Sequence, residues 1–237
     1  MLPLESIQKA HKIIAPVIER TAFSYAPKLS KLTSANIYLK KENLQRTGAF
    51  KIRGAFNKIA QMSEQSRAKG VIAASAGNHA QGVAYSATHF GIPSVIVMPE
   101  ATPLLKVLAT KELGAQVVLS GDNYDEAYSK AYQIAKERDL SFIHPFADEE
   151  VMAGQGTIAL EMIEEQELDF VLVPIGGGGL VGGILSAYKA LSPRTKIIGV
   201  QAKGANAMAT SFYAKKIQNA TSVRTIADGI AVRDVNA

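Results

Sequence analysis

One lysine in the first quarter of the chain stands in surroundings that suit covalent chemistry. Lys51 lies between Phe50 and Ile52, inside the run from Thr47 to Ala55 that also holds two glycines. Apolar neighbours exclude water from an ammonium group, and this loss of water lowers a lysine pKa toward the range where the neutral amine attacks a carbonyl. The alternative is a solvated surface lysine. Lys51 is therefore a candidate covalent catalyst.

A glycine-rich run from Ile175 to Gly183 is the second candidate, because it follows an apolar stretch and opens a predicted helix. Backbone N–H groups at such a helix start suit a phosphate. Gly177, Gly179 and Gly182 also satisfy the dinucleotide pattern, but the next strand ends in Gln201 where that site needs an acidic residue, and no Gly-Lys-Ser/Thr follows. We predict an anion site that is neither a dinucleotide site nor a nucleoside-triphosphate loop. The alternative is that the glycines only permit close packing.

Composition excludes several kinds of site. The 237 residues contain no cysteine, so disulfides, thiolate metal sites and cysteine nucleophiles are impossible. The four histidines lack the close spacing that metal ligation favours, so we predict no metal; they are His11, His79, His89 and His144.

The overall balance of residues is that of a globular protein, with 47% hydrophobic and 20% charged residues. The net charge of +5 comes from scattered lysines without an aromatic-interleaved basic cluster, so we predict no nucleic-acid partner. No apolar run is long enough to cross a bilayer, and the first residues lack a leader pattern, so we predict no membrane association and a cytoplasmic location.

Hydrophobic periodicity predicts an α/β protein. Short apolar runs alternate with helical stretches, which indicates parallel βαβ units with helices on both faces of each sheet. We predict two open, twisted, mostly parallel sheets in two domains: a larger one from 1–63 and 149–237, and a smaller one from 64–148. Predicted strands are 36–40, 71–74, 94–98, 116–119, 142–143, 170–173 and 196–201. Predicted helices are 4–20, one beginning near 50, one reaching 90, 103–113, 124–138, 149–165 and one reaching 191.

Lys51 falls in the first turn of its predicted helix, where the positive end of the helix dipole further disfavours a charged amine. A lysine placed to form a Schiff base and a cradle for one phosphate, on a two-domain α/β frame, together indicate pyridoxal 5'-phosphate as the cofactor.

With these motifs, the chain resembles the fold-type II pyridoxal-phosphate enzymes, of which tryptophan synthase β is one, and among them the threonine/serine dehydratases (ammonia-lyases). The match runs along the whole chain in family order. It rests on Thr47–Ala55, Ser75–Gly82, Gly154–Thr157, Gly176–Leu180 and Ile226–Gly229.

The resemblance implies a role for each site residue. Lys51 forms the Schiff base, Phe50 stacks near the cofactor ring and Asn78 hydrogen-bonds its phenolic oxygen. Ser75, Asn78 and His79 lie near the substrate carboxylate. From the residues alone, Asn78 as a helix N-cap and His79 as a surface histidine are the alternatives. The implied phosphate cradle is Gly176, Gly177, Gly178, Gly179 and Leu180.

The implied activity is β-elimination of L-threonine, with L-serine as a second candidate substrate, to a 2-oxo acid and ammonia. The partner is thus a small amino acid, and the resemblance also implies a homo-oligomer. A related racemase carries a proton-transfer serine where this chain has Ala76, and a divalent site where it has Gln201 and Ala207. Racemisation and that metal are therefore disfavoured. A β-replacing enzyme like cysteine synthase is disfavoured by the dehydratase form of 75–79.

The end of the sequence departs from the family pattern. After Ile226–Val232 the family continues with further strands and helices, including a serine that pairs with the pyridine nitrogen, whereas this sequence ends at Ala237. We therefore expect a larger domain that lacks its C-terminal part. The alternative function is a truncated cofactor-binding or interaction module without full activity.

Overall fold

A four-stranded parallel sheet organises the middle third of the chain. The computed structural model describes residues 1–235. The sheet has the strand order β5-β4-β3-β6, and β3 and β4 are buried at every position, as expected for inner parallel strands covered on both faces. The strands are β3 (Val71–Ala74), β4 (Ser94–Met98), β5 (Gln116–Leu119) and β6 (Ser141–Phe142).

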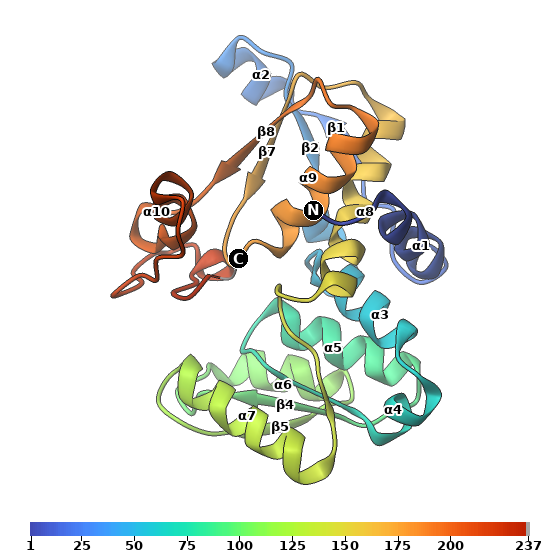
Figure 1. Cartoon of the computed structure of the whole chain (residues 1–237), viewed down its shortest axis with the longest axis vertical. Helices are drawn as coiled ribbons and strands as arrows, with labels where there is room; N and C mark the ends of the chain where they lie inside the picture. The colour runs from blue at the N-terminus through green and yellow to red at the C-terminus, as the bar shows by residue number, and fades with distance from the viewer. Residues whose placement is uncertain (236–237) are drawn as a thin grey trace.

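Helices cover this sheet on both faces, as Figure 1 shows in its lower half. Alternate residues of each strand point to opposite faces. Ala73 and Ile96 enter the core beneath α5 (Asn78–His89) and α6 (Leu104–Glu112). Ile72 and Val95 enter a second core beneath α7 (Tyr124–Arg138).

Helix α8 (Glu149–Glu165) is the centre of the other part, in the upper half of Figure 1. It is buried along almost its whole length and packs against three helices. These are α1 (Leu4–Ile14), α3 (Lys51–Gln61) and α9 (Gly179–Leu191). The parallel pair β7 (Phe170–Pro174) and β8 (Lys196–Val200) completes this core through Val171 and Val173.

The remaining elements are short. An antiparallel pair joins β1 (Phe23–Tyr25) to β2 (Tyr38–Lys40). The others are α2 (Pro27–Thr33), α4 (Glu64–Lys69), α10 (Ala207–Ala214) and the 3-10 turns η1 (Glu42–Leu44), η2 (Lys203–Ala205) and η3 (Asp228–Ile230). Within residues 1–235, none of the helices is long and apolar enough to span a membrane.

The structure confirms the predicted strands 71–74, 94–98 and 116–119 and the helices 124–138 and 149–165 at their stated bounds. Other predicted bounds were too long or shifted. The helix predicted to reach residue 20 ends at Ile14, because Pro16 has no N–H to continue it. The strand predicted at 36–40 is limited to Tyr38–Lys40, the one at 142–143 lies at Ser141–Phe142, and the one at 196–201 ends at Val200.

The two sheets differ in how they are covered. On β7–β8 one face carries exposed apolar side chains, with Leu172 65% exposed beside its register partner Ile198. The prediction of helices on both faces thus holds for the four-stranded sheet, and for β7–β8 one face stays open within residues 1–235. The domain bounds proposed from the sequence stay a prediction.

Candidate active site

A cavity of about 600 Å³ lies between the four-stranded sheet and the helices around α8. All the predicted site residues line it: Phe50, Lys51, Ser75, Asn78, His79, Gly176, Gly177, Gly178, Gly179 and Leu180. They come from α3, from the loop after β3 with the start of α5, and from the turn between β7 and α9. Motifs more than one hundred residues apart in the sequence therefore meet in one place, although their roles stay predictions.

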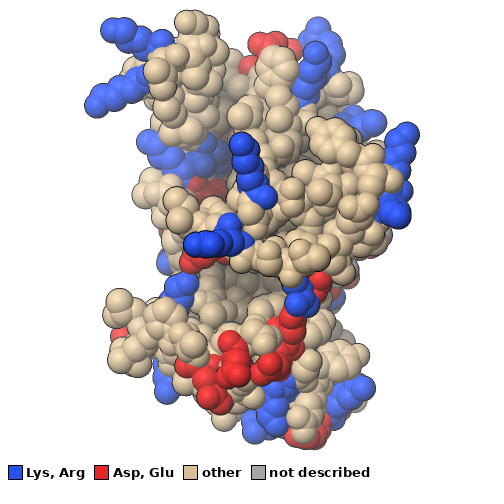
Figure 2. Space-filling view, turned by 90° about the vertical axis from the view of Figure 1, so that its left-hand side faces the viewer, with Lys and Arg blue, Asp and Glu red and all other residues tan. Residues whose placement is uncertain are grey.

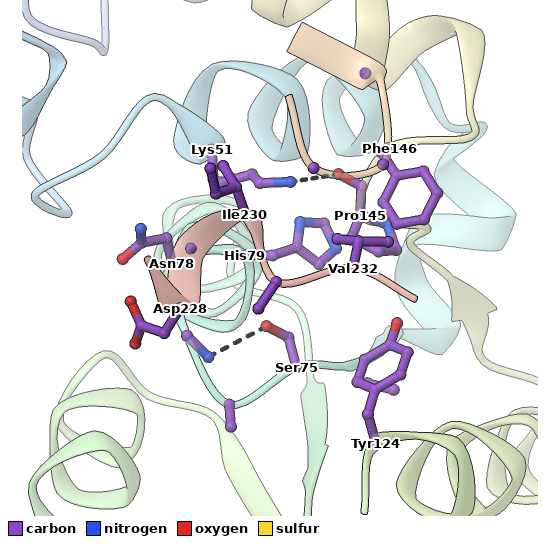
Figure 3. A pocket seen from close by; sticks show the side chains of 18 of the residues that line it. Lys51, Ser75, Asn78, His79, Tyr124, Pro145, Phe146, Asp228, Ile230 and Val232 are labelled. Carbon is purple, nitrogen blue, oxygen red and sulfur yellow. Dashed lines mark hydrogen bonds between the residues drawn. The ribbon is translucent and has the colours of Figure 1, made fainter. Parts of the chain in front are cut away.

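Lys51 is the first residue of α3 and so lies in the first turn, as predicted, and its side chain reaches into the cavity (Figure 3). Its amine donates a hydrogen bond to the Pro145 carbonyl oxygen at 2.7 Å and lies 5.5 Å from the centre of the Phe50 ring. Burial lowers the pKa of Lys51 to about 8. The amine is therefore partly neutral near physiological pH, which a nucleophile or a base requires.

His79 is buried, with 3% of its surface exposed, so the alternative of a surface histidine is wrong. Its Nε2 lies 2.9 Å from the Ile143 carbonyl oxygen and must carry the hydrogen, because a carbonyl only accepts. Burial, and secondarily the charge of Lys51, lowers the pKa of His79 to about 3. The His79 side chain is therefore neutral and hydrogen-bonded to the Ile143 backbone. It cannot stabilise an anion through a positive charge.

The segment from Ile143 to Ala147 crosses from β6 to α8 and forms one wall of the cavity. His79 binds its first residue and Lys51 its third. His144 Nδ1 accepts hydrogen bonds from the backbone N–H groups of Phe146, at 3.3 Å, and Ala147, at 2.8 Å. Its pKa is lowered by burial, which outweighs the opposing effect of nearby Asp148. This crossover segment is thus held by hydrogen bonds from His79 and Lys51 and by those of its own His144.

The loop after β3 presents Ser75 and Asn78. Ser75 Oγ accepts a hydrogen bond from the Gly77 N–H at 3.2 Å, which tightens the turn into α5 (Figure 3). Gly77 occupies the N-cap position and Asn78 is the first helical residue, without a capping bond from its side chain. The alternative that Asn78 is an N-cap is therefore wrong. Its exposed amide stays available at the cavity.

The glycine turn has two structural explanations. Gly178 has a φ of +97°, a conformation that side chains rarely adopt, and it caps the start of α9. A methyl group on Gly177 would lie 2.5 Å from the Phe146 ring, and one on Gly179 would lie 2.9 Å from the Phe146 backbone. Packing therefore already requires these glycines. The predicted anion site rests on the first N–H groups of α9, which have no partner within a helix.

Sequence reasoning predicted no site role for several other residues that line the cavity, among them Tyr124, Pro145, Phe146, Asp228, Ile230 and Val232. Figure 3 shows the Tyr124 hydroxyl pointing toward Val232. One signal was available for this tyrosine: it follows β5, and the carboxyl ends of parallel strands meet at one edge of a sheet. Asp228 belongs to the Ile226–Gly229 motif, to which the resemblance assigned no site role.

Two exposed ion pairs tie the C-terminal segment to the four-stranded part. Lys106 Nζ lies 3.0 Å from Asp228 Oδ2, and Arg233 Nη2 lies 2.7 Å from Asp125 Oδ2. Figure 2 shows acidic side chains gathered on the lower half, below a recess between the two parts. Because each ion pair is exposed, it adds little stability of its own.

Lys51 and the start of α9 fit pyridoxal phosphate. A desolvated amine suits the cofactor aldehyde, and a helix start with unpaired N–H groups suits its phosphate. Both line the same cavity. The fold and the site thus define a class of enzyme that holds this cofactor on a lysine.

Comparison with known proteins gives the family. The family described as pyridoxal-phosphate dependent enzyme matches residues 14–237, so the chain belongs to it. This confirms the cofactor predicted from the sequence.

The relatives are more specific. An L-threonine ammonia-lyase from Thermotoga maritima is 50% identical over 98% of this chain, which spans 58% of that relative's length. The solved structure of the processed form of threonine deaminase isoform 2 from Solanum lycopersicum is 40% identical, with a TM-score of 0.93 over 98% of this chain and 65% of the other. Maize serine racemase is 36% identical, with a TM-score of 0.95 over 98% of this chain and 71% of the other. These similarities confirm the predicted fold class.

Proposed function

We propose that this chain carries out pyridoxal-phosphate-dependent β-elimination of L-threonine, releasing ammonia and a 2-oxo acid, with L-serine as a second substrate. The observation that supports the proposal is the Lys51 amine, which is desolvated and faces the same cavity as the start of α9. The similarity to proteins named L-threonine ammonia-lyase and threonine deaminase supports the choice of reaction.

Lys51 has two tasks in this reaction. Its amine would hold the cofactor covalently, and as a free amine it would remove the proton from the substrate Cα. When bound, the cofactor supplies an electron sink for the charge that this leaves on Cα. A pKa of about 8 suits both tasks, because a base near the working pH both takes up and releases a proton readily.

Ser75, Asn78 and His79 would receive the substrate carboxylate at the start of α5. The first N–H groups of this 12-residue helix have no partner within the helix and lie at its positive end, which favours an anion. The side chain of His79 is neutral and already bound to Ile143, so its contribution is the placement of this loop. The Asn78 amide remains free for the cofactor's phenolic oxygen.

Racemisation is the alternative raised by the similarity to maize serine racemase. Ala76 lines the cavity where the related racemases carry a serine. An alanine methyl group cannot exchange a proton, so delivery of a proton to the second face of the substrate has no donor at this position. We therefore favour elimination.

Lys51→Ala tests the proposal directly. The variant should lose both the visible absorbance of lysine-bound cofactor and the release of ammonia from L-threonine. Lys58→Ala, on the same helix, is the matched control and should keep both. Ammonia release by Lys51→Ala at the wild-type rate would refute the assignment. Chiral analysis of the amino acid left after incubation would reveal a racemase, and incorporation of sulfide would reveal a β-replacing enzyme.

A cofactor-binding module without turnover is the other candidate, because the chain spans 58% of the Thermotoga maritima relative. Cofactor absorbance without ammonia release would favour it. Homo-oligomeric assembly and a cytoplasmic location stay predictions. Size-exclusion chromatography with light scattering tests the first, and fractionation of the cells tests the second.

A further inference from the structure

Arg53 is the largest side chain that is completely buried, with 0% exposure. It makes paired hydrogen bonds to two carboxylates. Its Nε and Nη2 each donate to Glu42 at 2.8 Å, and its Nη1 and Nη2 donate to Glu161 at 2.6 and 3.0 Å. Thr157 Oγ1 accepts a further bond from Nη1 at 3.1 Å. The whole guanidinium fork is therefore engaged.

A second buried cation balances the charge. Lys40 Nζ lies 2.6 Å from Glu161 Oε2 and donates to the Thr21 carbonyl oxygen at 2.6 Å. Burial opposes ionisation of Glu161, but the bonds from Arg53 and Lys40 outweigh burial and lower its pKa. Arg53, Lys40, Glu42 and Glu161 form a neutral set of two cations and two anions, which we call the buried quartet.

The buried quartet fixes α3 in place. Arg53 lies two residues after Lys51 on this helix, while its carboxylate partners lie on α8 and in η1, and Lys40, which pairs with Glu161, ends β2. The same face of α3 meets α8 closely, where Gln155 Oε1 accepts a hydrogen bond from the Gly54 N–H at 3.2 Å. A helix held by paired bonds on one side can neither slide nor rotate without breaking them. The direction in which Lys51 leaves the helix is set by the same contacts.

We propose that Arg53 is a positioning residue for Lys51, and that the buried quartet holds α3 so that the lysine amine stays inside the cavity beside the Pro145 carbonyl. The proposal deepens the proposed function and rests on it for the role of the amine. A lysine at position 53 would keep the charge, but its single ammonium cannot match two carboxylates in a fork. A buried arginine here is thus suited to orientation more than to stability, since buried ion pairs add little net stability.

The ionisable groups around the Lys51 amine are neutral or paired with one another. His79 from α5 and His144 from the crossover segment interact with Lys51, and both have lowered pKa values. The pKa of Tyr124 is raised, Lys106 pairs with Asp228, and Arg233 pairs with Asp125 and Asp234. Burial is the cause of the low pKa of Lys51, so an amine that swings out toward water should return toward 10.5.

The test measures the pKa of Lys51 by competitive acetylation and mass spectrometry over a pH series, on the full chain freed of cofactor. Arg53→Lys and Glu161→Gln are the test variants, and Lys58→Met removes an ion-paired cation from the same helix as the control. In both test variants we expect the pKa of Lys51, read as the midpoint of acetylation against pH, to rise from about 8 by more than half of the difference to 10.5. In the control it should stay at about 8. An unchanged midpoint in a folded test variant would overturn the proposal.

Folding is checked by circular dichroism and by the urea midpoint of each variant. If neither test variant folds, the same measurement is made on Thr157→Val. This substitution removes one hydrogen bond to Arg53 and keeps the shape of the side chain. A midpoint that does not rise in Thr157→Val then overturns the proposal. Acetylation needs no cofactor, so the outcome is separate from the proposed function: a shifted midpoint in a protein that never attaches the cofactor refutes only the proposed function.

Discussion

Gly154 allows α8 to approach α3, and replacing it tests whether this close crossing matters. A methyl group at Gly154 would lie 2.5 Å from the Arg53 carbonyl oxygen and 2.6 Å from the Gly54 Cα. Atoms in contact normally lie about 3.5 Å apart or more, so the helices have to separate by about 1 Å. Alanine is better than glycine in a helix by about 1 kcal/mol, whereas overpacking costs about 1–3 kcal/mol.

At Gly154 the cost of overpacking should exceed the gain in helix propensity, because backbone atoms cannot rotate away from the new methyl group. We expect Gly154→Ala to lower the free energy of unfolding by about 1–2 kcal/mol and to slow cofactor attachment, since Arg53 itself is displaced. Urea denaturation followed by circular dichroism measures the first effect and visible absorbance the second.

Gly182→Ala is the matched control for this experiment. A methyl group there would meet only the mobile end of Met152, at 2.5 Å. It should leave stability unchanged or raise it by up to about 1 kcal/mol. The reasoning is refuted if Gly154→Ala is as stable as the wild type, or if both variants lose the same free energy.

Three further predictions concern the cavity. The His79 imidazole stays neutral down to a pKa of about 3, but in the unfolded chain it binds a proton below about 6.5; stability should therefore fall as pH drops through this window, by up to about 1.4 kcal/mol per pH unit. As the pH decreases, the urea midpoint should fall less steeply in His79→Asn than in the wild type, and equal slopes would contradict the prediction. Tyr124, whose pKa burial raises to about 12, stays a phenol that can donate toward the substrate, so Tyr124→Phe should lower kcat/KM for ammonia release about tenfold. Tyr132→Phe, at a tyrosine of the same helix that does not line the cavity, should leave kcat/KM unchanged. Lys106→Met breaks the exposed pair with Asp228 and should change the free energy of unfolding by less than about 1 kcal/mol in urea; a larger loss would show that this pair holds the C-terminal segment.

The sequence predicted the central strands well because inner parallel strands are nearly continuous apolar runs. Val71–Ala74 and Ser94–Met98 have no polar face to confuse the pattern. Strand β1 escaped this reasoning, since three residues are too few to show alternation, and the antiparallel pairing of β1 with the predicted strand β2 was missed with it. The open face of β7–β8 was also not predictable, because periodicity shows which residues are apolar and cannot show what covers them.

The predicted site residues that share one cavity are those for which the chemistry needs a particular residue type, and their roles stay predictions. Lys51, Asn78 and the glycine turn each carry such a requirement, and all of them line the cavity. Pro145 and Phe146 were missed because an irregular segment has no period, and its contact with Lys51 joins residues 94 apart. The burial of His79 was hidden for a similar reason. Helix α3 packs so closely over α5 that a methyl group added at Gly82 would lie 3.1 Å from the Ile52 backbone, and no local sequence pattern indicates this packing.

The crossover segment also has a consequence for the order in which the molecule is made. During synthesis the chain emerges from its N-terminus, so Lys51 appears long before Pro145, which is 94 residues further on, and before Glu161, which lies 108 residues after Arg53. Until then the partners of the Arg53 guanidinium are Glu42 and the Glu19 carbonyl oxygen, and the Pro145 carbonyl oxygen that binds Lys51 is still absent. Contacts between such distant residues form late in folding. If the site works as proposed, a nascent chain can complete it only after α8 and the glycine turn have left the ribosome.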